Sequence, residues 1–443
     1  MQDLPRQVHT ALSMLGGAGF EAWIVGGCVR DLLLERTPQD FDITTNALPA
    51  QVEAVFSGQK VIETGRKHGT VTVLLDGMPL EITTYRVDLG YSDGRHPDAV
   101  AFTPNLRDDL ARRDFTVNAM AWNPVYGLVD CFGGQADLEK GLLRCVGEPE
   151  TRFSEDALRI LRLLRFASKL GFAIEDGTAQ AAHALREKLL QVSMERIQKE
   201  LTGFLCGGGA GEILVQFSDV FCVFLPELLK CENFSQNNPY HRYDVLTHLA
   251  KTVDAAPPEP VLRLAALLHD IGKPDCYTED EDGVGHFYGH AKRSEALADA
   301  ILTRLRYDND TRKKVCALVR EHDLPLEPVT ECSIRRVLSK LTPALFFPLL
   351  ELKRADCLAH GVPNPQRLAS LKQAETVARE LLAQEACFSL NNLAVNGDDL
   401  IKAGVPQGQS VGRALQVLLD AVLDNKVAND KTALLAYWRA RTD

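Results

Sequence analysis

Two aspartates near the start of the chain, Asp40 and Asp42, have the spacing of a metal site. Side chains two residues apart on a strand point to the same face, so these carboxylates would lie side by side. They repel each other unless a divalent cation lies between them, and Mg²⁺ bridging to a triphosphate is the commonest occupant. Glu81, between two apolar neighbours on a second expected strand, is a candidate third carboxylate. The alternative is that all three are solvated residues of edge strands.

A glycine pair, Gly26-Gly27, follows the apolar run 22–25 and opens a helical run. Glycines at a strand-to-helix turn let backbone N–H groups approach a phosphate closely. With the two aspartates that follow, the pair predicts a pocket for a magnesium-bound triphosphate.

A second group of residues suited to chemistry lies in the later half of the chain: His248, His269, Asp270, His290, His322 and Asp356. His269-Asp270 closes an apolar helical stretch, and the other members come from other helices. Such a mixed nitrogen and oxygen set suits Mn, Fe, Ni or Mg. The spacing leaves His241, His286 and Asp323 open as rival ligands.

The elements that must position these residues change in kind along the chain. The first 145 residues mix short β-branched runs with turn signals, and 71–75 and 80–85 predict a hairpin around Asp76-Gly77. From Ser154 onward the apolar residues recur with helical periodicity. We therefore expect an α+β chain, with a small mixed sheet followed almost entirely by helices.

Composition narrows the class of protein. A chain of 443 residues favours several domains. A formal net charge of -11 argues against holding nucleic acid by bulk positive charge, although local basic faces remain possible. Eleven cysteines without a CxxC pair indicate buried thiols in a reducing compartment. Without a targeting signal or a membrane-length apolar run, we expect a cytoplasmic protein with no membrane partner.

Over about residues 20 to 205, the chain resembles the class II tRNA nucleotidyltransferases and their bacterial poly(A) polymerase relatives. The resemblance rests on ordered motifs: Gly26-Gly27-x-Val29-Arg30-Asp31-x-Leu33, Asp40-x-Asp42, Arg112-Arg113-Asp114-Phe115-Thr116-Val117-Asn118-Ala119-Met120, Asp130-Cys131-Phe132-Gly133-Gly134 and Glu155-Asp156-Ala157-Leu158-Arg159. It implies transfer of CMP and AMP from CTP and ATP to the 3′ end of tRNA, without a nucleic-acid template and with release of pyrophosphate.

The resemblance also implies roles for residues of the motifs. Asp40 and Asp42 would hold the Mg²⁺ ions of two-metal transfer, with Glu81 in support. The incoming nucleotide would contact Gly26, Gly27, Arg30, Arg113, Asp114, Asn118, Glu155, Asp156, Arg159 and Arg162. For the Arg112-Arg113-Asp114 run, the alternative is a surface ion-pair cluster.

Asp156 and Arg159 are expected to read the base. We expect a helix capped near Ser154, on which these two residues, three apart, share one face. A fixed carboxylate acceptor and guanidinium donors can imitate the Watson-Crick edge of a base, with Glu155 as their orienter. The alternative is an ordinary ion pair on an exposed helix.

A loop of Gly, Ser, Asp and Pro is predicted over 85–97, and it carries Arg86 and Asp88. The resemblance implies that such a flexible loop helps the switch from C to A addition. Its presence favours a CCA-adding or A-adding enzyme over a CC-adding one.

The histidine set resembles the HD-domain metal phosphohydrolases over about residues 240 to 360. The resemblance implies His248, His269, Asp270 and Asp356 as the central ligands of a second divalent metal, with His290 and His322 as additional ligands. HD domains attached to this polymerase family either hydrolyse phosphoesters or serve as scaffold.

The expected domains are a nucleotidyltransferase head at 1–148, a nucleotide-reading helical neck at 149–230, an HD helical domain at 236–360 and a helical tail at 361–443. Because phosphate contacts supply most of the affinity for RNA, basic clusters such as Lys353-Arg354 are expected to contact tRNA.

Three alternatives stay open in the sequence. The first is an A-adding enzyme or poly(A) polymerase with the same chemistry. The second is an HD phosphohydrolase in which the head senses nucleotides, and the third is a non-catalytic RNA-binding scaffold. The oligomeric state is not encoded in any pattern we recognise.

Overall fold

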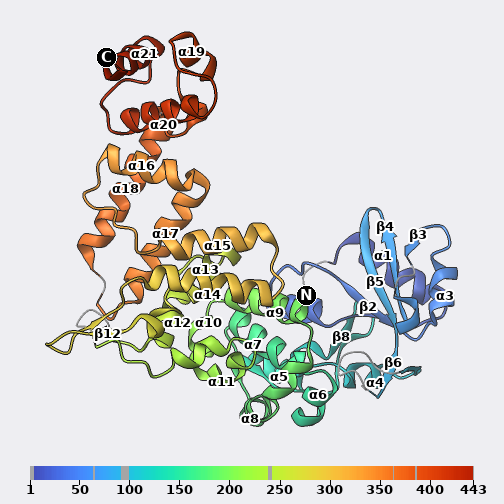
Figure 1. Ribbon diagram of the computed structural model, residues 1–443. Coiled ribbons are helices and arrows are strands. Elements are labelled where there is room, and N and C mark those ends of the chain that lie inside the picture. The colour runs from blue at the N-terminus through green and yellow to red at the C-terminus, as the bar shows by residue number, and fades with distance from the viewer. Residues whose placement is uncertain are drawn as a thin grey trace. The chain divides into compact units, whose positions relative to one another are not determined.

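The computed structural model describes residues 4–62, 65–90, 99–237, 242–362, 364–384 and 387–442. The chain forms two compact units, Met1–Pro226 and Glu227–Asp443 (Figure 1). The first contains the sheet, and the second is built almost wholly of helices. The finer division into four domains stays a prediction.

A seven-stranded mixed sheet organises the first unit. In spatial order its strands are β3 (Lys60–Ile62), β4 (Thr70–Leu75), β5 (Met78–Thr84), β2 (Asp42–Thr45), β1 (Ala22–Val25), β8 (Met120–Asn123) and β9 (Gly127–Asp130). The β2–β5 pair is parallel, and the other neighbours are antiparallel. The expected mixed sheet and the hairpin, which is β4–β5, are therefore confirmed.

Short helices surround this sheet: α1 (Arg6–Gly17), α2 (Gly27–Leu33), α3 (Pro49–Val55), α4 (Leu106–Ala111) and α5 (Gly134–Glu139). Helix α2 packs on β1 and β8, whereas α1 contacts β1 and α3 contacts β4 and β5. The glycine pair thus lies where the buried strand β1 passes into α2, as the sequence predicts.

The structure corrects the prediction that Arg86 and Asp88 lie in a loop. They belong to β6 (Arg86–Leu89), which pairs antiparallel with β7 (Ala99–Phe102). The backbone hydrogen bonds of this hairpin extend the chain before the Gly, Ser and Pro residues that predicted a loop. Those residues, at 91–97, lie outside the described part of the chain.

The first unit continues in helices α6 (Pro149–Glu155), α7 (Leu158–Leu170), α8 (Asp176–Ala184), α9 (Met194–Leu205), α10 (Ala210–Gln216) and α11 (Ser218–Cys222), with the short parallel strands β10 (Leu142–Leu143) and β11 (Ala173–Ile174). The expected helix cap near Ser154 is wrong. Helix α6 already begins at Pro149, because proline suits the first helical position, and it ends at Glu155, before Asp156, whose backbone is extended.

The second unit contains α12 (Val245–Ala255), α13 (Pro260–Leu268), α14 (His290–Arg304), α15 (Asn309–Glu321), α16 (Glu331–Leu341), α17 (Pro343–Ala359), α18 (Pro365–Ala383), α19 (Gly397–Lys402), α20 (Gln409–Leu423) and α21 (Lys431–Thr442). A small hairpin joins β12 (Thr278–Glu279) to β13 (Gly285–His286).

Short 3₁₀ turns occur in both units: η1 (Arg66–His68), η2 (Thr116–Asn118), η3 (Arg186–Gln191), η4 (Pro226–Lys230), η5 (Lys273–Cys276) and η6 (Leu390–Asn392).

From composition we expect unpaired cysteines and no apolar segment of membrane-spanning length. No disulfide joins any of the eleven cysteines, all of which lie in described segments. Among the residues that the structure describes, no helix combines the length and apolar character needed to traverse a bilayer.

Candidate functional site

The three predicted acidic residues, Asp40, Asp42 and Glu81, lie near one another around strand β2. In the parallel β2–β5 pair, Asp42 is opposite Glu81. Asp40 comes just before β2 rather than within it, so the strand spacing assumed from the sequence does not hold for this residue. Asp40 and Asp42 nevertheless line the same cavity, of about 490 Å³.

The pKa of Asp42 reflects this crowding. Its enclosure by the cavity walls is the largest influence and raises the pKa, although part of its surface faces the open space. Arg113 opposes the rise, while the charges of Asp40 and Glu81 add to it, and the pKa reaches about 6. A cation among the three carboxylates would relieve this strain, which is the behaviour expected of a metal site.

Gly26 lets an arginine approach the turn between β1 and α2. Its φ is +85°, in the left-handed region, and a Cβ here would lie 2.8 Å from Nη1 of Arg113. Arg113 is itself largely enclosed, and this desolvation lowers its pKa although Asp109 favours the charge. The turn therefore requires glycine both for its backbone conformation and for the space that the guanidinium occupies.

Asp114 is a buried carboxylate that joins three elements. Its Oδ2 accepts hydrogen bonds from Nε and Nη2 of Arg162 on α7, at 2.8 and 2.5 Å. Its Oδ1 accepts one from the Asn118 amide at 3.1 Å, and Arg30 of α2 donates to Asn118 Oδ1 at 2.7 Å. Burial opposes the charge, but Arg162 and Asn118 hold the pKa of Asp114 well below its usual range.

Seven of the ten expected nucleotide residues line one cavity, and Glu155, Asp156 and Arg159 do not. Its walls include Gly26, Gly27, Arg30, Arg113, Asp114, Asn118 and Arg162, together with Asp40 and Asp42. Neither Arg86 nor Asp88 lines it. The walls also include residues that the sequence analysis did not single out for this site: Arg36, Thr37, Gln39, Arg165, Phe166, Lys169 and Leu170.

A second cavity, of about 260 Å³, shares Arg113, Asp114 and Arg162 with the first and contains Asp156 and Arg159. The Arg159 guanidinium is held firmly. It donates to Glu155 Oε2 at 2.6 Å, to the Arg152 carbonyl at 3.2 Å and to the Arg112 carbonyl at 3.1 Å. Glu155 thus contacts Arg159 as expected, although it does not line the cavity.

Asp156 is positioned differently from the prediction. It does not share a helix face with Arg159, because the chain is extended at Asp156 between α6 and α7. Its Oδ1 accepts a hydrogen bond from the Leu158 N–H at 3.0 Å, and its Oδ2 accepts one from Arg196 at 2.7 Å. Sequence reasoning missed Arg196, which also lines the cavity, because no local pattern connects residues 40 apart.

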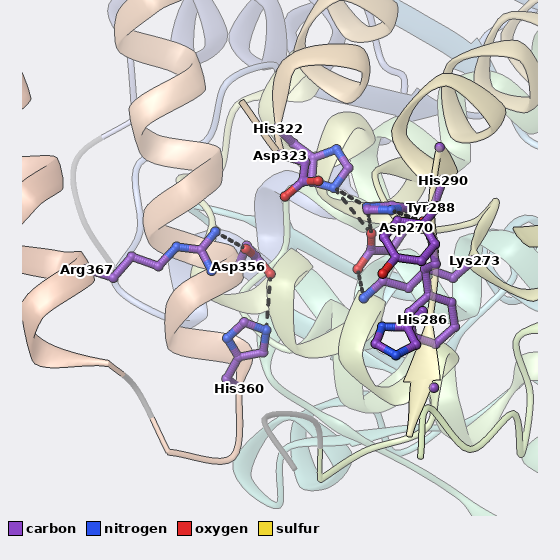
Figure 2. Close-up of a pocket in the computed structure, with 13 residues that line it drawn as sticks. Asp270, Lys273, His286, Tyr288, His290, His322, Asp323, Asp356, His360 and Arg367 are labelled. Atoms are coloured by element: carbon purple, nitrogen blue, oxygen red, sulfur yellow. Dashed lines mark hydrogen bonds and ion pairs between the residues drawn. The ribbon is translucent and has the colours of Figure 1, made fainter. Parts of the chain in front are cut away.

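In the second unit, all six predicted metal ligands converge, and Figure 2 labels Asp270, His290, His322 and Asp356 among them. His248 Nε2 lies 3.2 Å from Asp356 Oδ1, 3.3 Å from Asp270 Oδ2 and 3.2 Å from His269 Nε2. On the other side of the same carboxylate, His290 and His322 each place Nε2 3.3 Å from Asp270 Oδ1. Asp270 thus lies between two clusters of donor atoms.

The histidine ring orientations favour metal binding. Nδ1 of His269, His290 and His322 each lies 2.6 to 2.8 Å from the backbone carbonyl three residues earlier. A carbonyl only accepts, so each Nδ1 carries the proton and each Nε2 of a neutral ring presents a lone pair. The Nε2 atoms of His290 and His322 are only 3.2 Å apart. Two acceptors at that distance need a cation or a proton between them.

Asp270 Oδ1 gives independent support, because it is buried and has no hydrogen-bond donor among the described residues. Burial disfavours charge on His269, but Asp270 and Asp356 outweigh it and raise its pKa to about 10, so its Nε2 carries either a proton or a metal ion. The pocket therefore attracts positive charge, and its oxygen and imidazole donors fit a divalent transition metal.

The rival ligands named from the sequence do not join the converging histidines and aspartates among the described residues. His286 and Asp323 line the pocket of about 330 Å³, but His286 lies 2.8 Å from Asp280 and neither joins a group of converging donors. His241 lies outside the described residues. The sequence analysis missed His360, which does converge with His248 and Asp356.

The structure corrects the prediction that Lys353 contacts RNA. Its side chain is buried and donates to the His322 carbonyl at 2.5 Å, and burial lowers its pKa to about 8. A buried ammonium cannot meet a phosphate backbone, so Lys353 supports the histidine pocket instead. Its neighbour Arg354 is partly exposed and pairs with Glu351 and Glu375.

Comparison with known families covers both units. Residues 22–144 match the family model of the poly A polymerase head domain. Residues 171–230 match the model of an RNA and SrmB-binding site of polymerase A, and residues 278–438 match that of tRNA nucleotidyltransferase domain 2.

Curated relatives match nearly the whole chain. The CCA-adding enzyme of Geobacillus thermodenitrificans is 45% identical over 99% of this chain and 97% of its own length. That of Lactiplantibacillus plantarum is 44% identical, over 100% of this chain and 98% of its own. That of Limosilactobacillus fermentum is 32% identical over 98% and 97%.

Solved structures agree in fold. The Bacillus stearothermophilus CCA-adding enzyme in complex with CTP matches with a TM-score of 0.75 and 29% identity, over 100% of this chain and 98% of that one. The Thermotoga maritima CCA-adding enzyme complexed with tRNA matches over 99% and 97% with a TM-score of 0.63, and at 19% identity it supports the fold alone.

The geometry of the glycine turn generates a stability prediction. Gly26→Ala should lower the free energy of unfolding by about 1–3 kcal/mol, because the new Cβ meets Arg113 and the backbone has positive φ. Gly27→Ala is the control, since its Cβ would meet only Nη2 of Arg30, at an ordinary 3.6 Å. Denaturant unfolding of both variants measures the difference, and equal stability would contradict the account.

Proposed function

The chain belongs to the family of CCA-adding enzymes, the tRNA nucleotidyltransferases, and we propose that the cavity lined by β2, α2 and α7 is its transferase site. The reaction adds CMP and AMP from CTP and ATP to the 3′ end of tRNA and releases pyrophosphate. The observation that carries the proposal is the convergence of Asp40 and Asp42 with the Asp114–Arg162 pair in one cavity.

Asp40 and Asp42, supported by Glu81, are the proposed ligands of Mg²⁺. The raised pKa of Asp42 argues for this, because three crowded oxygen donors suit a hard divalent ion. When bound, such ions neutralise phosphate charge and activate the attacking hydroxyl. Divalent metal use follows from the family, and the choice of Mg²⁺ is our proposal.

Positioning of the triphosphate is assigned to the arginines of the cavity. Nucleotidyl transfer depends mainly on alignment and charge neutralisation. Arg30 and Arg162 are anchored through Asn118 and Asp114, so their guanidinium groups are already in place before a nucleotide binds. Arg113 approaches through the space left by Gly26.

Base selection is assigned to Asp156 and Arg159 in the second cavity. Glu155 orients Arg159, and Arg196 orients Asp156. An acceptor and a set of donors held this rigidly can form hydrogen bonds to cytosine or adenine in place of a template strand. An A-adding enzyme or a poly(A) polymerase would use the same groups, but curated relatives named CCA-adding enzymes span nearly the whole chain and favour CCA addition.

The histidine pocket supports a second function, phosphoester hydrolysis by a metal centre. The observation that favours it is the orphaned Asp270 Oδ1 facing the lone pairs of His290 and His322. His248, His269, Asp270, Asp356, His290 and His322 would hold Mn, Fe, Ni or Mg. This activity would accompany nucleotide addition rather than replace it. We also place the enzyme in the cytosol, in keeping with its unbridged thiols.

Removing either carboxylate of the transferase site should abolish both C and A addition. We expect Asp40→Asn and Asp42→Asn to lower incorporation by about a thousandfold or more, because metal-ligand positions are lost without a change of shape. Labelled CTP and ATP with a tRNA lacking its 3′ end give the measurement. Asp76→Asn in the β4–β5 turn is the isosteric control. Near-normal incorporation by either variant would refute the site.

The pKa of Asp42 predicts a pH dependence. Because a raised pKa keeps the acid protonated below about pH 6, the ligand is lost as pH falls through that value. The Mg²⁺ concentration for half-maximal activity should rise about tenfold per pH unit below 6 and stay level above 7. A Mg²⁺ requirement that is the same at pH 5 and 7.5 would count against this ligand.

Arg159→Ala should impair nucleotide choice more than transfer. Loss of its base contacts costs about 1–3 kcal/mol of discrimination, so misincorporation of UMP and GMP should rise about tenfold or more. Arg186→Ala, outside both cavities, is the control. Unchanged selectivity in Arg159→Ala would remove this residue from base reading.

His269→Ala should leave nucleotide addition within about twofold of wild type, while the metal content of the purified chain falls. The reason is that His269 belongs to the second unit, whose donors are distinct from the carboxylates of the sheet. Incorporation assays paired with elemental analysis test both parts. Loss of addition with retained metal would contradict the separation of the two sites.

A further inference from the structure

The histidine pocket contains a seventh donor that belongs to neither motif. His360 directly follows α17, one turn after Asp356. Its Nε2 lies 3.7 Å from Asp356 Oδ1, the oxygen that His248 also contacts (Figure 2). The rings of His360 and His248 are nearly parallel, with centroids 5.3 Å apart and an interplanar angle of 13°.

We propose that His360 is a ligand of the metal ion held by His248 and Asp356. This rests on the metal centre proposed above and adds a donor to it. One atom from each of the three residues lies within 4.8 Å of the others. Bonds of about 2.1 Å in octahedral geometry place neighbouring ligand atoms about 3 Å apart and opposite ones about 4.2 Å apart. The observed spacing needs only small side-chain adjustments to close around one ion.

The surroundings of Asp356 favour this arrangement. Arg367 donates to its Oδ2 at 3.0 Å, which leaves Oδ1 turned toward His248, His269 and His360. In Figure 2, His360 and Arg367 approach Asp356 from different directions, away from His290 and His322. Each carboxylate oxygen of Asp356 therefore has a separate role.

With His360 as a ligand, the two ends of the pocket differ in the number of protein donors that they offer. One end offers donors from five residues, in two groups of three that share His248: one adds Asp356 and His360, and the other adds His269 and Asp270, whose Oδ2 also pairs with Lys273 at 2.6 Å. The other offers three: Asp270 Oδ1, His290 and His322. Sites closed by protein ligands hold metal structurally, whereas open sites keep positions for water and substrate. The ion near His360 is thus the tightly held one, and the end with His290 and His322 is the open one.

The donor chemistry also selects the ion. Three imidazoles and two carboxylates at the closed end suit Mn, Fe, Co, Ni or Zn better than Mg. Asp270 would lie between the two ends, with one oxygen directed to each. Loss of His360 should therefore weaken one ion selectively.

The test is a Co²⁺ titration of the full-length apo chain, followed by visible absorption and by elemental analysis of bound metal. We expect the histidine pocket to bind two ions with distinct affinities, separate from any ion held by Asp40 and Asp42. In His360→Ala and His360→Gln, the tighter ion should weaken about tenfold or more and its absorption spectrum should change, because one nitrogen ligand is gone. His286→Ala, a histidine of the same pocket outside the converging groups, should titrate as wild type.

The outcomes separate the two proposals. If both His360 variants bind Co²⁺ with wild-type affinities and spectra, His360 is not a ligand, and the metal centre itself stands. If the wild-type chain binds no Co²⁺ and His269→Ala has no effect on metal content, the metal centre fails and this inference fails with it. Circular dichroism of each variant establishes that the helices are intact, and His360→Gln keeps the test valid if His360→Ala does not fold.

Discussion

The parallel pairing of β2 with β5 is the constraint on which the transferase site depends. It sets Asp42 directly opposite Glu81, and Asp40 reaches the same cavity from the residues before β2. Backbone hydrogen bonds of the sheet hold these charges together despite their repulsion, and the raised pKa of Asp42 is the electrostatic consequence. A fold that holds acidic groups this close together is prepared to bind a cation between them.

A second buried carboxylate, Asp114, ties this sheet to the helices that follow. Through Arg162 it fixes α7, and through Asn118 and Arg30 it fixes α2. Breaking such a buried network by removing one partner leaves uncompensated charge, which costs about 3–5 kcal/mol. Asp114 and Arg162 line both cavities, and Asn118 and Arg30 line the first, so the contacts that stabilise the fold are also placed to position the nucleotide.

The histidine pocket also holds metal-binding donors in fixed positions, but its donors are imidazoles and carboxylates. Carbonyl groups fix the Nδ1 protons of His269, His290 and His322, and the remaining lone pairs converge on Asp270. Lys353, buried behind His322, braces this arrangement by donating to a carbonyl. In both units, polar groups are held by the backbone in positions that favour a bound cation.

The sequence predicted the mixed sheet, the hairpin and the convergence of most acidic and histidine residues, because short motifs and strand alternation carry that information locally. It did not predict Arg196 or His360, whose partners are brought near by helix packing and by the end of α17. The sequence analysis placed Asp156 on a helix face, because the break between α6 and α7 depends on backbone conformation that no local pattern shows. It also predicted an exposed Lys353, because lysine is rarely buried, whereas this side chain is buried.

The most direct measurement is Mn²⁺ binding by electron paramagnetic resonance, with CTP present, to the wild-type chain and to Asp42→Asn. Both chains carry the same histidine pocket, so the difference reports on the carboxylates of the sheet alone. The account predicts that the variant binds one or two fewer ions while its histidine pocket stays loaded. Equal binding by the two chains would show that the sheet carboxylates hold no metal and would contradict the central claim.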